Sequence, residues 1–380
     1  MTRRHSKRAR NYIAKITDDK QRQAKTSSHE TVERCVVMGI VTASRVAMAC
    51  KFEIVALSDD EAYLSATLER ALDEVEQLEL QLSPFIFDSH LSDINRHAYH
   101  YPVKVEPQLF WLLKRAVRIG VETGGAFDIT VGALTLSEKQ GRACNNTSTV
   151  LHGSRAEGEQ NALVGLKWLQ LDDDTMTVKF LREGIAIDLC GIAKGYAVDV
   201  VASRLQEAGV DCFFVHGGKS SMYAFNKLPN ADVWRIGVTN PIKPSERLAV
   251  IELCSGVGVG VSEWCINSAK GKMIHIVDPR SPNRNGSLGN AEGSKVLRAY
   301  AICKSATDAD ALSTAFLLLG VNGVKRHCEL HKGRGAVLLV REGNEVKVLS
   351  FGLKGLAKIY HLLPQTKDDI PDMAGGDTSL

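Results

Sequence analysis

The chain has 380 residues, of which 44% are hydrophobic and 24% are charged. These proportions are ordinary for a soluble globular protein and exclude a disordered, collagen-like or disulfide-dense chain. The length fits one large domain or two closely packed lobes, and no run approaches the 18 apolar residues that a transmembrane helix needs.

Positive charge is concentrated at the N-terminus. Residues 1–30 hold nine Lys and Arg against three acidic residues, so the rest of the chain is mildly acidic, with 38 basic and 41 acidic residues. We interpret residues 1–30 as a disordered basic tail, 32–362 as a single domain and 365–380 as a frayed C-terminal tail. An acidic body argues against a nucleic-acid partner. No apolar signal core follows the basic start, and the nine cysteines form no C-x-x-C pair, so we expect a cytoplasmic protein.

The first predicted elements are two strands and two helices. β-Branched residues over 36–57 indicate two extended segments, VVMGIVTAS and VAMACKFEIVAL. Apolar residues at steps of three and four predict a helix over 64–82, which Ser83-Pro84 ends. A second helix begins at Pro107 and ends at Gly124-Gly125. The polar residues 138–161 predict a surface loop.

The second half mixes short strands with helices. Because strands and helices do not alternate strictly, we predict an α+β fold rather than a doubly wound sheet. The expected elements are the strands MTVKFL, IAIDL, CFFVH, WRIGVTNP and LAVIELCSGVGVGVS, helices over 192–208 and 307–320, a polar loop over 281–295, and the hairpin AVLLVR–EGN–EVKVLS.

Two glycine-containing motifs are candidates for ligand binding. In the segment 123–132, TGGAFDITVG, paired glycines let the backbone approach a ligand, although on their own they fit a helix cap followed by a turn better. In the segment 187–199, IDLCGIAKGYAVD, a turn opens a helix whose first turn carries Lys194. Free N–H groups beside a lysine suit a phosphate-bearing ligand, and an Asp cap with surface charges is the alternative.

Two further motifs need a choice of interpretation. The segment 216–221, HGGKSS, is not a P-loop, because Phe213 stands where the first glycine is required and no helix start follows. In the segment 271–280, GKMIHIVDPR, His275 lies on an extended apolar run. A histidine there is usually structural, and the adjacent Lys, Asp and Arg keep a functional site open as the alternative.

Asp310 and Thr314 are four residues apart, on one face of a predicted helix. A carboxylate and a hydroxyl one turn apart offer two hard oxygen ligands to Mg²⁺. The pattern Thr307-x-x-Asp310 also fits a variant capping box, so spacing leaves both interpretations open.

In their order along the chain, these motifs resemble the ApbE family of FAD:protein FMN transferases. The resemblance covers residues 35–355 and is carried by Met38-Gly39, the Ser83-Pro84-Phe85 block, GGAFDITVGAL, IDLCGIAKGYAVD, VHGG, WRIGVTNP, GKMIHIVDPR and ADALSTAFLLLG.

The resemblance implies an enzyme that binds FAD with Mg²⁺, transfers FMN to a Thr or Ser hydroxyl of an acceptor protein, and releases AMP. It also implies a two-lobed arrangement of mixed or antiparallel sheets flanked by helices. It places His275 as the general base for the acceptor hydroxyl, and Gly191 (through its backbone), Asp310 and Thr314 as metal ligands. The positions expected to contact FAD are Met38, Phe85, Ala126, Phe127, Asp128, Lys194, His275 and Ile276.

The sequence departs from the family pattern at three points. Lys219 stands where many members have Asp, Val261-Ser262-Glu263 replaces Thr-Ser-Gly, and Met38-Gly39-Ile40 replaces Met-Gly-Thr. Two other functions therefore stay open: a protein that binds FAD or a nucleotide without transfer, and a pyrophosphatase that splits FAD into FMN and AMP.

Overall fold

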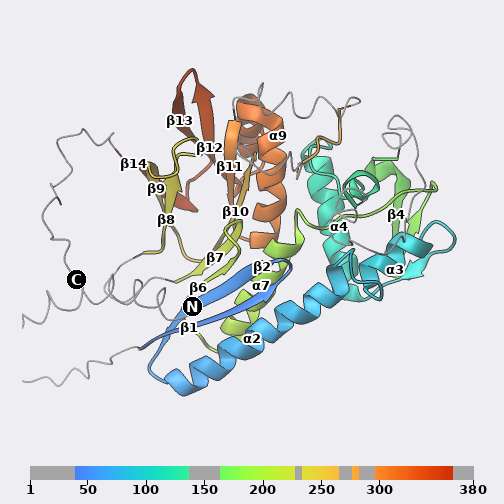
Figure 1. Ribbon diagram of the computed structural model, residues 1–380, viewed down its shortest axis with the longest axis horizontal. Coiled ribbons are helices and arrows are strands. Elements are labelled where there is room, and N and C mark those ends of the chain that lie inside the picture. Colours follow the sequence, from blue (N-terminus) through green and yellow to red (C-terminus); the bar gives the residue numbers. More distant parts are fainter. Residues whose placement is uncertain (1–38, 137–162, 227–232, 265–275, 282–295, 363–380) are drawn as a thin grey trace, which may run out of the picture. The chain divides into compact units, whose positions relative to one another are not determined.

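An eight-stranded sheet forms the centre of the computed structural model, which describes residues 39–136, 163–226, 233–264, 276–281 and 296–362 (Figure 1). Every neighbouring pair of its strands is antiparallel. In spatial order the strands are β1 (Gly39–Ala47), β2 (Cys50–Ser58), β6 (Cys212–Gly217), β7 (Ser221–Phe225), β10 (Val257–Glu263), β11 (Val296–Cys303), β12 (Gly335–Glu342) and β13 (Glu345–Phe351).

Three long helices pack against one face of this sheet. Their apolar residues form one core with the inward residues of β2, β6, β11 and β12. The helices are α2 (Glu61–Leu82), α7 (Ala193–Glu207) and α9 (Ala306–Leu330). The other face packs against a three-stranded antiparallel sheet formed by β14 (Ala357–His361), β9 (Arg247–Leu253) and β8 (Arg235–Thr239).

Residues 90–180 add two helices and a second three-stranded sheet. α3 (His90–His97) and α4 (Pro107–Glu122) lie beside β3 (Val103–Lys104), β5 (Thr177–Phe180) and β4 (Leu169–Asp172), with a 3-10 turn at Leu166–Trp168. The apolar side of α4 joins the core of the large sheet through Leu109, Phe110 and Leu113.

The α+β class is confirmed, with several local differences from the predicted elements. The first hairpin turns at Met48-Ala49 rather than near Arg45, and both turn residues have positive φ, 49° and 57°. The segment IAIDL forms no strand, because Ala186 makes only an isolated bridge to Val131. The last helix runs beyond residue 320 to Leu330, with a kink at Gly320 (φ 67°). The predicted loop over 138–161 lies outside the described residues.

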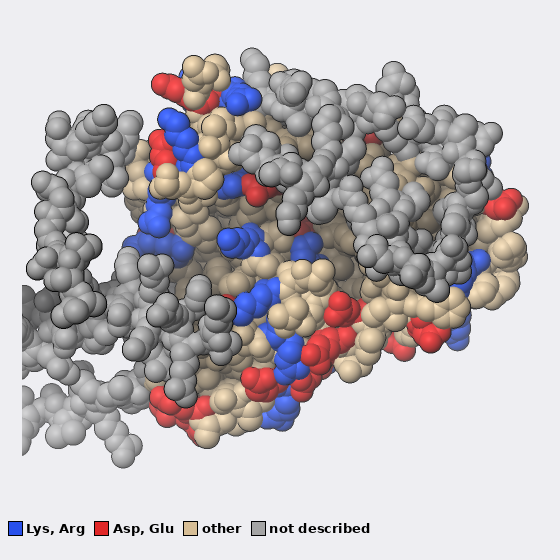
Figure 2. All heavy atoms as spheres, viewed as in Figure 1, with Lys and Arg blue, Asp and Glu red and all other residues tan. Residues whose placement is uncertain are grey.

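Charged side chains of both signs are interleaved on the face seen in Figure 2, with acidic groups gathered along α2. Arg45 of β1 contacts three of these acids, Glu69, Asp73 and Glu76, at 2.8–3.0 Å. Within the described part of the chain, no helix combines the length and hydropathy needed to cross a bilayer.

Candidate active site

Helix α9 carries Asp310 at its contact with helix α7. The Asp310 carboxylate is only 4% exposed, and its Oδ2 accepts a hydrogen bond from the backbone nitrogen of Gly195 at 2.9 Å. A Cβ atom at Gly195 would lie 2.7 Å from Asp310 Cβ and would overlap the carbonyl of Ala306. The glycine in the sequence AKGYA is therefore what allows the two helices to come together at this carboxylate.

Strand β10 supports α9 from the sheet side through the alternating glycines of VGVGV. A Cβ at Gly260 would overlap the carbonyl of Ala309 and lie 2.6 Å from the nitrogen of Asp310. One at Gly258 would lie 2.6 Å from the carbonyl carbon of Ser305. Because side chains alternate along a strand, the intervening Val257 and Val259 point into the core on the opposite face. The glycines on one face of β10 thus allow the α9 backbone at Asp310 to lie directly against the sheet.

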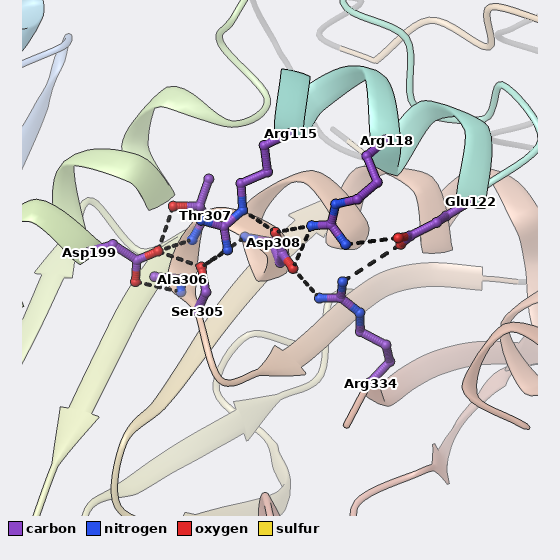
Figure 3. A network of polar contacts seen from close by, with 9 residues as sticks. All are labelled: Arg115, Arg118, Glu122, Asp199, Ser305, Ala306, Thr307, Asp308 and Arg334. Atoms are coloured by element: carbon purple, nitrogen blue, oxygen red, sulfur yellow. Dashed lines mark hydrogen bonds and ion pairs between the residues drawn. The ribbon is translucent and has the colours of Figure 1, made fainter. Parts of the chain in front are cut away.

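The start of α9 is held by charged groups from two other helices (Figure 3). Asp199 of α7 accepts hydrogen bonds from the backbone nitrogens of Ala306 (2.8 Å) and Thr307 (2.9 Å) and from the hydroxyl of Ser305. A carboxylate at a helix start satisfies free N–H groups and complements the helix dipole. Asp199 therefore fixes the first turn of the helix that carries Asp310 and Thr314.

Asp308, in the same turn, is buried among arginines. Arg115 and Arg118 of α4 contact its carboxylate at 2.5 and 3.2 Å, and Arg334 also pairs with it. Burial alone would raise the pKa of Asp308, but the hydrogen bonds and charges of Arg115 and Arg334 lower it below the ordinary value. Glu122 bridges Arg118 and Arg334 at the far end of this network.

A cavity of about 450 Å³ opens beside Asp310 and Thr314. Segments far apart in the sequence meet around it: residues 126–135, 188–194, 220, 261–262, 276–279 and 310–314. Of the residues expected at the site, its lining includes Ala126, Phe127, Asp128, Gly191, Lys194, Ile276, Asp310 and Thr314.

The other expected residues lie elsewhere. Phe85 lines an adjacent apolar cavity of about 150 Å³, which shares Cys190 and Lys194 with the larger one, and its side chain is 45% exposed. Met38 and His275 lie outside the described residues, although Ile276, the neighbour of His275 in the chain, lines the larger cavity.

The larger cavity is rich in buried carboxylates. Asp128, Asp188 and Asp310 all line it, and burial raises the pKa of Asp128 and of Asp310. Among the described lining residues, Lys194 is the cationic one. Its Nζ lies 4.0 Å from Asp310 Oδ2, and the charge of Asp310 raises the pKa of Lys194. An anionic ligand therefore needs a further cation in this cavity.

The sequence analysis did not select two polar residues of this cavity. Asp188, which accepts from the Thr135 hydroxyl at 2.6 Å and the Cys190 nitrogen at 2.9 Å, could have been found as the acid immediately before the glycine turn. Ser262, whose hydroxyl lies 3.1 Å from Thr314 Oγ1, could have been found as the one residue of the 261–263 segment that matches the family's Thr-Ser-Gly. Its neighbour Glu263 stands where the family pattern has Gly. The Glu263 carboxylate accepts a hydrogen bond from Arg298 Nε at 2.7 Å, so Arg298 is its partner in this structure.

The donor set suits a small hard cation better than a soft one. The described residues contain no cluster of three or more His, Cys, Asp or Glu side chains able to hold a metal. A carboxylate, a hydroxyl and a backbone carbonyl, by contrast, are oxygen ligands of the kind that Mg²⁺ accepts together with water and phosphate. A Cβ at Gly191 would come to 3.2 Å from the Phe127 ring and 3.8 Å from Thr314 Oγ1, so the glycine keeps the space between them open.

Comparison with known proteins gives one consistent result. The family model described as the ApbE family matches residues 47–339. A FAD:protein FMN transferase of Vibrio cholerae is 28% identical over 294 residues, which cover 76% of this chain and 79% of that protein.

Solved structures agree on the fold. The flavin transferase ApbE from Vibrio cholerae superposes with a TM-score of 0.70 at 24% identity, covering 84% of this chain and 99% of that one. The ApbE protein from Thermotoga maritima gives a TM-score of 0.68 at 26% identity, covering 81% and 96%.

Proposed function

The chain belongs to the ApbE family, and we propose that it is a FAD:protein FMN transferase, which moves FMN from FAD to a Thr or Ser hydroxyl of an acceptor protein and releases AMP. One observation carries the proposal most directly. The 126–128 segment, Lys194 and the Asp310/Thr314 pair, separated by nearly 190 positions, line one cavity in a chain whose relatives are named for this reaction.

We propose that Mg²⁺ binds to the Asp310 carboxylate, the Thr314 hydroxyl and the backbone carbonyl of Gly191. Two features of the cavity support this assignment. Asp310, Thr314 and Gly191 all line it, and a Cβ at Gly191 would lie 3.8 Å from Thr314 Oγ1. The surplus of carboxylates would otherwise repel a diphosphate. When bound, the metal would neutralise charge on the phosphate oxygens during transfer.

Other residues of the two cavities would bind the phosphates and the ring systems of FAD. The ammonium of Lys194 is held by Asp310 and the Cys190 carbonyl, at 4.0 and 2.9 Å, and would pair with a phosphate oxygen. Phe127 in the larger cavity and Phe85 in the apolar one offer faces for the two ring systems of FAD. Ala126 and Asp128 flank Phe127, and Ile276 also lines the larger cavity.

In the transfer step, the acceptor oxygen would form a bond to the FMN phosphorus while the bond to the bridging oxygen breaks and AMP leaves. The hydroxyl proton needs an acceptor, and we propose His275 for this role. An imidazole with a pKa near neutrality suits general-base catalysis, which contributes roughly 10²–10⁴-fold in rate. Met38 is proposed as an additional contact to FAD.

The function is tested by incubating the full chain with FAD, Mg²⁺ and a candidate acceptor protein. We expect a fluorescent flavin band on the acceptor in a denaturing gel, together with an equal amount of AMP. AMP with free FMN and no labelled acceptor would instead establish a pyrophosphatase. FAD binding without AMP would establish a binding protein. Either result would overturn the proposed transfer.

A further inference from the structure

Three hydroxyl groups connect strand β10 to the cavity face of α9. The Ser313 hydroxyl contacts the Asp310 carbonyl oxygen at 2.8 Å. Ser262 Oγ lies 2.8 Å from Ser313 Oγ and 3.1 Å from Thr314 Oγ1. Ser262 follows Gly258 and Gly260 at steps of two along β10, so it shares the strand face that packs on α9.

The direction of each hydrogen bond in this chain of hydroxyls follows from its first member. A carbonyl oxygen can only accept, so the single proton of Ser313 is used on Asp310. Ser262 must therefore donate its own proton to Ser313. With that proton used, Ser262 can only accept a hydrogen bond from Thr314. The Thr314 proton is then directed toward Ser262, and the lone pairs of Thr314 Oγ1 are not occupied by this contact.

We infer that Ser262 is a positioning residue. It accepts the hydrogen bond that the Thr314 hydroxyl donates, and so leaves a lone pair of the Thr314 oxygen free to bind a cation in the cavity. The inference rests on the proposed function, in which Thr314 is a metal ligand. A hydroxyl binds a cation through a lone pair, so its proton must be directed elsewhere. Partners of this kind typically change metal affinity by roughly 10–100-fold when removed.

Without Ser262, the Thr314 hydroxyl has a competing arrangement within its own helix. A threonine hydroxyl in a helix readily turns to the carbonyl four residues earlier, which here belongs to Asp310. It could equally turn its proton toward the cavity. Both rotations reduce the time during which a lone pair faces the metal site.

The experiment measures metal binding separately from turnover, using Mn²⁺ as the probe. Free Mn²⁺ is followed by electron paramagnetic resonance during titration of the full chain with FAD present and no acceptor. We expect Ser262→Ala to weaken Mn²⁺ binding about tenfold and Ser262→Thr, which keeps a hydroxyl, to restore most of it. In turnover, Ser262→Ala should raise the apparent KM for Mg²⁺ while kcat at saturating Mg²⁺ stays within about twofold of wild type.

Ser262→Gly provides a second variant if Ser262→Ala does not fold, because glycine already occupies positions 258 and 260 of the same strand face. Wild-type Mn²⁺ affinity in a folded Ser262→Ala or Ser262→Gly protein would overturn the inference. Failure of the proposed function looks different: the wild type would bind Mn²⁺ normally yet label no acceptor. If the wild type binds no Mn²⁺, the metal assignment and this inference fall together.

Discussion

The ammonium nitrogen of Lys194 lies 4.0 Å from Asp310 Oδ2, and the same nitrogen donates to the Cys190 carbonyl at 2.9 Å. Burial raises the pKa of Asp310, and the charge of Lys194 lowers it by a smaller amount, so the pKa stays above its ordinary value. The 4.0 Å separation is too long for a full hydrogen bond. The Asp310 carboxylate is therefore not hydrogen-bonded to Lys194, and a cation bound in the cavity would further favour its ionised form.

Asp310→Asn tests this arrangement with little change of shape. An amide oxygen can still accept from the Gly195 nitrogen, so the helices should stay packed. The loss of the charge removes the proposed metal ligand, an interaction worth several kcal/mol, and we expect AMP release from FAD to fall at least about 100-fold. The activity that remains should not respond to Mg²⁺ or to EDTA. Mg²⁺-stimulated turnover in this variant would remove Asp310 from the metal site.

The glycines of β10 give a prediction about stability. In Gly260→Ala, the new methyl group meets the backbone of α9 at Ala309, which cannot move aside as a flexible side chain could. Overpacking costs about 1–3 kcal/mol and occasionally more, and we expect about 3 kcal/mol in urea unfolding. Gly237→Ala is the matched control, because its methyl group meets only the flexible Arg247 side chain in an exposed strand. Equal losses in the two variants would contradict the close approach of α9 to β10.

His275→Ala tests the proposed general base. FAD binding, followed by quenching of flavin fluorescence, should stay within about twofold of wild type, while flavin transfer falls at least tenfold. The decrease should appear in kcat, since the role proposed for the histidine in the transfer step is to accept the proton of the acceptor hydroxyl, and its contact with FAD is one of several. Transfer at the wild-type rate would exclude His275 from the mechanism.

Much of the fold was predictable where apolar periodicity and end signals agree. The helix over 64–82 and the hairpin around EGN occur as predicted, in α2 and in β12–β13. The predicted element boundaries are wrong where the residue types do not indicate the backbone conformation that the structure has. Met48-Ala49 turns with positive φ although neither residue favours it, and Gly320 kinks α9, whose second part runs on to Leu330. β11 (VLRAYAIC) was not among the predicted strands, although the polar loop predicted over 281–295 ends directly before it.

The site could be predicted as a set of motifs but not as a geometry. The order of the motifs indicated the family, and most of the expected residues line one cavity. Ser262 and Asp199 gain their significance only from tertiary contacts with α9. The residues next to a serine in a strand, or to an aspartate within a helix, do not indicate which residues 50 to 110 positions away it will contact.

The pH dependence of stability should reflect His327, which is buried in the second part of α9. Its ring packs 4.4 Å from the His331 ring and 5.3 Å from the Phe316 ring. Burial, and then the charges of His331 and Arg334, lower the pKa of His327 to about 4, while the backbone of Glu122 acts weakly in the opposite direction. In the unfolded chain a histidine titrates near 6.5. Between these values the unfolded chain binds a proton that the native protein excludes, so stability falls as the pH falls.

The full effect is about 3 kcal/mol between pH 6.5 and 4, at 1.36 kcal/mol for each pH unit. His327→Leu should remove this part of the dependence, so that its free energy of unfolding in urea declines less than that of wild type between pH 7 and pH 5. His361→Leu, at an exposed position on β14, serves as the control and should keep the wild-type slope. If the His327→Leu slope equals that of wild type, the histidine is protonated in the native state and its burial does not limit stability in acid.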